Sequence, residues 1–155
     1  MIIVWIAMRP ITEIILHCSA TEEGRDFTAE DIRRWHVDGR GWSDIGYHFV
    51  IRLDGTIELG RPITMAGAHC LGHNLYSIGV CYVGGLDHNL NPKDTRTPEQ
   101  KAALDELLRV LHRMFPAATV HGHSEFARKA CPCFSPRPPW GTEGVYTQGK
   151  MQRAM

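Results

Sequence analysis

The stretch TEIILHCSA, residues 12–20, is a short apolar run that ends in polar and small residues. A run of this kind, bounded by polar residues, predicts a buried β-strand. His17 lies at the carboxyl end of that strand, where the sheet opens to solvent and functional sites gather. The segment therefore predicts one strand of the core together with one candidate site residue.

The segment TAEDIRRWH, residues 28–36, predicts the first helix. Thr28, with Asp31 three residues on, resembles a capping pair whose side chains satisfy free N–H groups at a helix start. Ile32 and Trp35 can share one face of this helix. The glycines that follow are expected to end it.

Two further segments predict strands. In YHFVIRLDGTIELGR, residues 47–61, strand-like residues surround Asp54-Gly55, which is a strong hairpin turn signal. SIGVCYVGG, residues 77–85, predicts a second buried strand that two glycines close. Residues 84–96 are polar, with Asp, Asn and Pro, and predict a loop.

The segment TPEQ opens the longest predicted helix. Thr97 is expected at the N-cap, Pro98 at the first helical position, and Gln100 completes a capping box. The apolar residues that recur at helical spacing, and so predict a core-facing side, are Ala103, Leu104, Leu107, Leu108, Leu111 and Phe115. After Pro116 the segment ATVHGH predicts a last short strand.

The predicted order of elements is strand, helix, hairpin, strand, helix, strand. This order indicates a single α/β (α+β) domain over residues 1–155, with a central mixed β-sheet flanked by helices. MIIVWIA, residues 1–7, is expected to form an edge or core strand, since it lacks a basic region and is too short to span a bilayer. The tail over about residues 135–155, rich in proline and glycine, is expected to be irregular.

Charge and cysteine content argue against several classes of protein. Lys plus Arg number 17 and Asp plus Glu number 17, so the chain lacks the basic excess of a dedicated nucleic-acid binder. The sequence shows no signal peptide and no membrane-inserting segment. An odd number of cysteines, five, then favours a reducing compartment over a disulfide framework.

The segment HGHSEFARKACPCF, residues 121–134, gathers two histidines, a lysine and two cysteines. Imidazole and thiolate are good zinc ligands, so His123 and Cys131 offer half of a site. A disulfide between Cys131 and Cys133 would need a strained ring. A third ligand must come from elsewhere, and His17 at its strand end is one candidate. The histidines that compete with it are His36, His48, His69 and His73.

Four segments in order together resemble one family: ILHCSAT, GWSDIGYHFVIRLDGTIELGR, AGAHCLGHNLYSIGVCYVGG and HSEFARKACP. The resemblance is to the zinc-dependent N-acetylmuramoyl-L-alanine amidases of the phage T-seven lysozyme and peptidoglycan recognition protein family. It runs from about residue 14 to about residue 134. It implies the peptidoglycan recognition protein-like amidase fold.

The resemblance also implies the residues of an active site. The zinc ligands of the family match His17, His123 and Cys131, which would hold one Zn²⁺ per chain. Three protein ligands leave one zinc position open, which is the arrangement of a catalytic site. Tyr47 and Lys129 match the catalytic tyrosine and lysine of the family.

Substrate contacts are implied at two positions. His69 matches the histidine of the GAH motif, which lines the substrate groove in the family. Asn74 is a candidate contact for sugar or peptide, although asparagine is also a common turn residue. Cys133 departs from the family, where a small residue is common, and its thiol competes with Cys131 for the metal.

The resemblance implies hydrolysis of the amide between N-acetylmuramic acid and L-alanine in peptidoglycan. The expected protein is a monomeric phage or prophage endolysin that waits in the host cytoplasm and acts on the cell wall after release. One alternative is a non-catalytic module that binds peptidoglycan. Another is an amidase with a second role, in which it binds a phage RNA polymerase and restrains it.

Overall fold

Strand β1, Glu13–Cys18, lies within a five-stranded sheet whose order is β4-β3-β5-β1-β7. The computed structural model describes residues 9–136. β1 pairs in parallel with β5, Ser77–Tyr82, on one side and with β7, Thr119–Gly122, on the other. Because strands flank it on both sides and its last five residues are buried, β1 is an apolar run rather than an alternating one.

The predicted hairpin closes the other edge of the sheet. β3, Phe49–Ile51, is parallel to β5, and β4, Ile57–Leu59, is antiparallel to β3. The turn between them contains Gly55 at φ +87°, a conformation that glycine adopts without strain. Four parallel strands and one antiparallel strand make the sheet mixed, so the predicted sheet type is confirmed.

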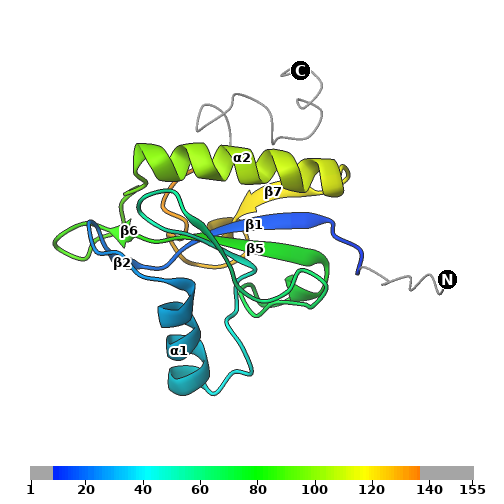
Figure 1. Cartoon of the computed structure of the whole chain (residues 1–155), viewed down its shortest axis with the longest axis horizontal. Coiled ribbons are helices and arrows are strands. Elements are labelled where there is room, and N and C mark those ends of the chain that lie inside the picture. The colour runs from blue at the N-terminus through cyan, green and yellow to red at the C-terminus, as the bar shows by residue number, and fades with distance from the viewer. Residues whose placement is uncertain (1–8, 137–155) are drawn as a thin grey trace.

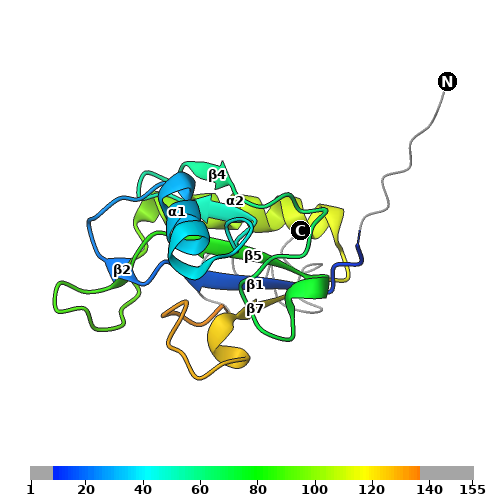
Figure 2. The same ribbon diagram turned by 90° about the horizontal axis from the view of Figure 1, so that it is seen from below.

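The two helices lie on opposite faces of this sheet (Figures 1 and 2). Both helices begin at capping boxes, as the sequence predicts. In α1, Ala29–Arg40, Thr28 accepts from the Asp31 N–H and the Asp31 carboxylate accepts in return. α2, Pro98–Met114, starts in the same way at Thr97 with Gln100.

The larger part of the core lies between the sheet and α2. Alternate side chains of the strands point toward α2, and the α2 residues at helical spacing meet them. The members of this layer that are at most 3% exposed are Ile14, Leu16, Ile51, Ile78, Val80, Tyr82, Leu104, Leu108 and Leu111. The predicted core-facing side of α2 is therefore confirmed.

α1 packs on the other face through a smaller apolar layer. Ile32 is buried there beside Ile45, Val50 and Val83. The prediction that Trp35 shares the buried helix face with Ile32 is wrong, because Trp35 is 40% exposed and His36 is buried instead. His36 lies one turn beyond Ile32, so the buried stripe follows the four-residue step of the helix.

The segment predicted as a loop after β5 contains a short strand. β6, Gly85–Leu86, pairs in parallel with β2, Thr21–Glu22, to form a separate two-stranded sheet. The strand expected over residues 1–7 and most of the tail expected after residue 134 lie outside the described residues. Within residues 9–136 no helix is long and apolar enough to cross a membrane.

Replacing Gln100 is expected to destabilise the junction of α2 with the sheet. Its fully buried amide donates to the carbonyls of Ile51 and Val83. We expect Gln100→Leu to lower the free energy of unfolding by about 2–4 kcal/mol, because the buried carbonyls of Ile51 and Val83 lose their hydrogen-bond donor. Urea unfolding measures this change, and Lys101→Ala on the exposed side of the same helix should change it by less than about 0.5 kcal/mol.

Candidate metal centre and active site

Three side chains that can bind a metal converge where β1 ends. His17 points to the face opposite α2, because its neighbours in β1 point toward α2. His123 follows the end of the adjacent strand β7, and Cys131 lies on the loop beyond it. One ligand atom from each of the three lies within 4.8 Å of the others. The structure thus brings together the three residues predicted as zinc ligands.

The spacing of this cluster fits a tetrahedral metal ion. Zinc bonds of about 2.3 Å to sulfur and 2.0–2.1 Å to nitrogen separate two ligand atoms by about 3.6 Å. The distance from His17 Nδ1 to Cys131 Sγ is 3.7 Å. Two imidazoles with a thiol are also a ligand set that zinc accepts. The cluster can therefore hold a metal ion.

Cys133 lies apart from this cluster. Cys131 Sγ accepts the backbone N–H of Cys18 at 3.2 Å, which orients the sulfur at the strand end. The Cys133 thiol instead lies 3.3 Å from the Gly85 carbonyl and 4.0 Å from Cys18 Sγ. Cys18 follows His17 and faces the other side of the sheet. Burial raises the pKa of Cys133 to about 12, so it remains a neutral thiol.

The electrostatics of the site favour neutral imidazoles. His17 is 1% exposed, and this burial, followed by the nearby His69, His123 and Lys129, holds its pKa well below the ordinary value. Burial and then Lys129 also lower the pKa of His123. A neutral imidazole keeps a free lone pair, which is the form that binds a metal.

Tyr47 lies against the metal-ligand cluster. Its ring centroid is 5.1 Å from that of His17. Burial, and then the nearby Cys81, Cys131 and Cys18 thiols, raise the pKa of this phenol well above its ordinary value. Tyr47 is therefore a protonated hydroxyl that can donate a hydrogen bond beside His17.

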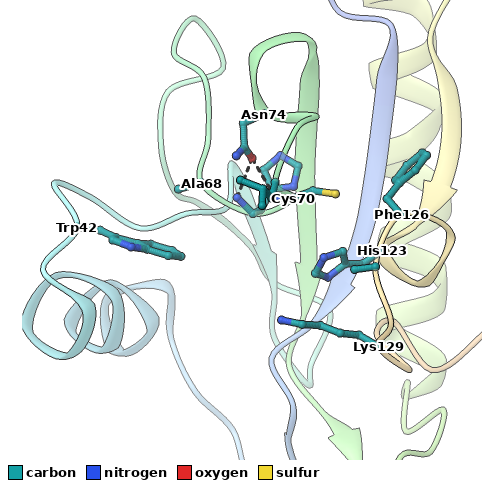
Figure 3. A pocket seen from close by; sticks show the side chains of 10 residues that line it. Trp42, Ala68, Cys70, Asn74, His123, Phe126 and Lys129 are labelled. Atoms are coloured by element: carbon teal, nitrogen blue, oxygen red, sulfur yellow. Dashed lines mark hydrogen bonds between the residues drawn. The ribbon is translucent and has the colours of Figure 1, made fainter.

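A pocket of about 550 Å³ opens beside His123. Figure 3 shows Trp42 on one side of it, His123 and Phe126 on the other, and Lys129 reaching in between them. Trp42 and Phe126 are site residues that the sequence interpretation missed. Both lie within the quoted motifs, Trp42 in the same segment as Tyr47 and Phe126 in the same segment as His123. An aromatic residue that shares a segment with a candidate site residue was therefore the available signal.

The two residues predicted to bind substrate line the same pocket. His69 uses both ring nitrogens in buried contacts, with His17 Nε2 at 2.8 Å and Ser77 Oγ at 3.1 Å. The Asn74 amide oxygen accepts the backbone N–H groups of His69 and Cys70. These contacts leave the Asn74 amide nitrogen as a group that can meet a ligand, whereas His69 is only 9% exposed and offers the pocket a small part of its ring.

His36 and His48, which competed as ligands, are structural. His36 Nδ1 accepts the Gly46 N–H at 2.9 Å, and His48 Nδ1 accepts the Gly79 N–H at 3.0 Å. Burial lowers the pKa of each to about 4. Both histidines are therefore neutral in the folded protein at neutral pH.

These two histidines predict acid sensitivity between pH 6.5 and pH 4. Above pH 6.5 both folded and unfolded chains carry neutral imidazoles, so stability is complete. Below it only the unfolded chain takes up protons, and stability falls until the folded pKa of about 4 is reached. Each histidine can contribute up to about 3 kcal/mol to this loss.

Urea unfolding at several pH values, with a chelator present throughout, measures this acid sensitivity. His36→Asn keeps an acceptor near the Nδ1 position but removes the titrating group, so we expect a shallower pH dependence than in the wild type. Equal slopes in the two proteins would contradict the assignment for His36.

The fold, with a His-His-Cys cluster that can hold a metal ion beside an open pocket, fits one class of protein, the hydrolases. The sequence profile described as N-acetylmuramoyl-L-alanine amidase matches residues 7–134. The chain belongs to the N-acetylmuramoyl-L-alanine amidase family. The family, fold class and enzyme class predicted from the sequence are confirmed.

The relatives come from both branches of the predicted resemblance. The endolysin of Enterobacteria phage K11 is 45% identical over 123 residues, which cover 79% of this chain and 81% of that protein. The endolysin of Escherichia phage T7 is 40% identical over 137 residues, which cover 88% of this chain and 90% of that protein. The solved structure of Drosophila PGRP-LB superimposes with a TM-score of 0.70 at 27% identity, covering 81% of this chain and 76% of that one.

Proposed function

We propose that this amidase is a phage endolysin that uses zinc to hydrolyse the bond between N-acetylmuramic acid and L-alanine in peptidoglycan. The observation that carries this proposal is the convergence of His17, His123 and Cys131 beside a pocket. The relatives named endolysins support the biological role. The proposal treats residues 1–155 as one amidase domain, as the sequence predicts.

The chain's own residues divide the work at the scissile amide. His17, His123 and Cys131 would hold the zinc ion, which would supply Lewis-acid chemistry for activating water at the amide carbonyl. The Lys129 ammonium lines the pocket next to His123 and stabilises negative charge on the carbonyl oxygen. Tyr47, whose ring lies 5.1 Å from that of His17 and whose hydroxyl stays protonated, is the second candidate donor to this oxygen.

The pocket walls orient the substrate. Trp42 and Phe126 offer apolar surface to the sugar ring and the peptide side chains. His69 and the amide nitrogen of Asn74 complete the wall nearest the loop before β5. The peptidoglycan is therefore held with its amide toward the metal-ligand cluster.

The cellular role follows from the same assignment. An endolysin acts on the cell wall after release and is held in the host cytoplasm before lysis. The joint presence of Cys131, Tyr47 and Lys129 favours an amidase over a module that only binds peptidoglycan. A second role with a phage polymerase, and the monomeric state, stay predictions from the resemblance.

Two measurements on the purified protein test the proposal. Bound zinc is quantified per chain, and new L-alanine amino termini are followed during digestion of peptidoglycan with and without a chelator. We expect one zinc per chain and chelator-sensitive release. Release that continues unchanged after complete removal of zinc, or none from zinc-loaded protein, would overturn it.

A further inference from the structure

A chain of buried hydrogen bonds leads away from the metal-ligand cluster. His17 Nε2 lies 2.8 Å from His69 Nδ1, and His69 Nε2 lies 3.1 Å from Ser77 Oγ. The three residues are 1%, 9% and 0% exposed, so water does not compete for these contacts. The contacts join β1, the loop before β5 and the first residue of β5.

The ring geometry sets the direction of each hydrogen bond in this chain. His17 directs Nδ1 toward Cys131 Sγ, so Nδ1 must carry the lone pair if the imidazole is a metal ligand. The proton then resides on His17 Nε2, which donates to His69 Nδ1. His69 in turn carries its proton on Nε2 and donates to the Ser77 hydroxyl oxygen.

The fold reserves a slot for the His69 ring. A Cβ placed on Gly79 would lie 2.7 Å from both Cδ2 and Cγ of this ring. A Cβ placed on Gly67 would also lie 2.7 Å from Cδ2. Glycine at both positions lets the imidazole lie flat against the backbone. The Asn74 amide oxygen accepts the backbone N–H groups of His69 and Cys70 and so fixes the loop that carries this ring; the dashed lines at Asn74 in Figure 3 mark such hydrogen bonds.

We infer that His69 and Ser77 are positioning residues that fix the tautomer and ring direction of His17 for metal binding. The inference rests on the proposed zinc site and deepens it. It also gives His69 a role beyond the substrate contact predicted from the sequence. Partners that orient a metal-bound histidine typically contribute about 10–100-fold to metal affinity.

Zinc affinity, measured by competition with a chromophoric chelator, tests the inference apart from catalysis. We expect His69→Phe, which fills the slot but accepts no hydrogen bond, to weaken zinc binding roughly 10–100-fold. His69→Asn presents an amide oxygen near the Nδ1 position and should restore most of the affinity. Ser77→Ala should weaken binding less, by about 2–10-fold.

A matched control and a spectroscopic measurement exclude a merely structural effect. His36→Asn alters another buried histidine that does not reach the cluster, and it should bind zinc as the wild type does. Imidazole ¹H–¹⁵N spectra of wild type should show His17 protonated at Nε2, with that signal shifted in His69→Phe. A folded His69→Phe with zinc affinity within twofold of wild type overturns the inference.

The remaining outcomes also decide between the two proposals. If His69→Phe does not fold, the Ser77→Ala variant decides. Unchanged zinc affinity and unchanged imidazole spectra in Ser77→Ala overturn the positioning role of His69 and Ser77. Wild type that binds zinc but releases no L-alanine amino termini overturns the proposed function. The zinc affinities of the variants still test the positioning role of His69 and Ser77 in that case. Wild type that binds no zinc overturns the proposed metal site, and with it the positioning role of His69.

Discussion

Replacing Cys131 by serine is expected to abolish tight zinc binding and amidase activity, whereas Cys133→Ser should leave both nearly unchanged. Structural zinc sites are worth about 10–16 kcal/mol, which sets the scale for what each protein ligand contributes. Loss of one of three protein ligands should remove about 4 kcal/mol, or roughly 10³-fold in affinity. Cys131 Sγ belongs to the cluster, while Cys133 lies beside Cys18 and Gly85.

The measurement is zinc content after dialysis against a weak chelator, together with release of L-alanine amino termini from peptidoglycan. Cys133→Ser is the matched control, since it makes the same chemical change two positions away. Cobalt substitution adds a direct observation, because a thiolate ligand produces an intense near-ultraviolet band that Cys131→Ser should lack. Loss of zinc in Cys133→Ser, with retention in Cys131→Ser, would reverse the assignment of the ligand.

Local signals explain why most of the fold could be predicted from the sequence. Thr28 and Thr97 each begin a helix with a reciprocal side-chain cap, and such caps depend on residues three positions apart. The hairpin at Gly55 depends on a similarly short segment. The β2–β6 pair was missed because strands of two residues carry no periodic pattern and depend on a distant partner.

The site was harder to predict, because its residues meet only through the pairing of parallel strands. β1 lies between β5 and β7, which brings His17 beside His123 although they are far apart in sequence. From the residues alone several histidines competed for the third ligand position, and only the family resemblance selected His17. The contact of His69 with His17 had no local signal, since it depends on the loop that Asn74 holds.

Removing the charge of Lys129 is expected to lower kcat by roughly 10²–10³-fold, the usual effect of losing one donor to a developing oxyanion. Lys129 is exposed at the pocket and lies close enough to His17 and His123 to lower their pKa values. Lys129→Met keeps most of the aliphatic stem and removes only the ammonium. Because charge develops on the carbonyl oxygen during the reaction, KM should change much less than kcat.

Arg128→Met is the matched control, since it removes an exposed neighbouring cation that does not line the pocket. It should retain kcat within about threefold, and both variants should unfold in urea like the wild type, as surface substitutions usually do. A rise in KM with unchanged kcat in Lys129→Met would instead show that Lys129 binds the ground state of the substrate. Equal losses of kcat in the two variants would mean that the general positive charge of this loop matters, and that the Lys129 ammonium does not act directly on the oxyanion.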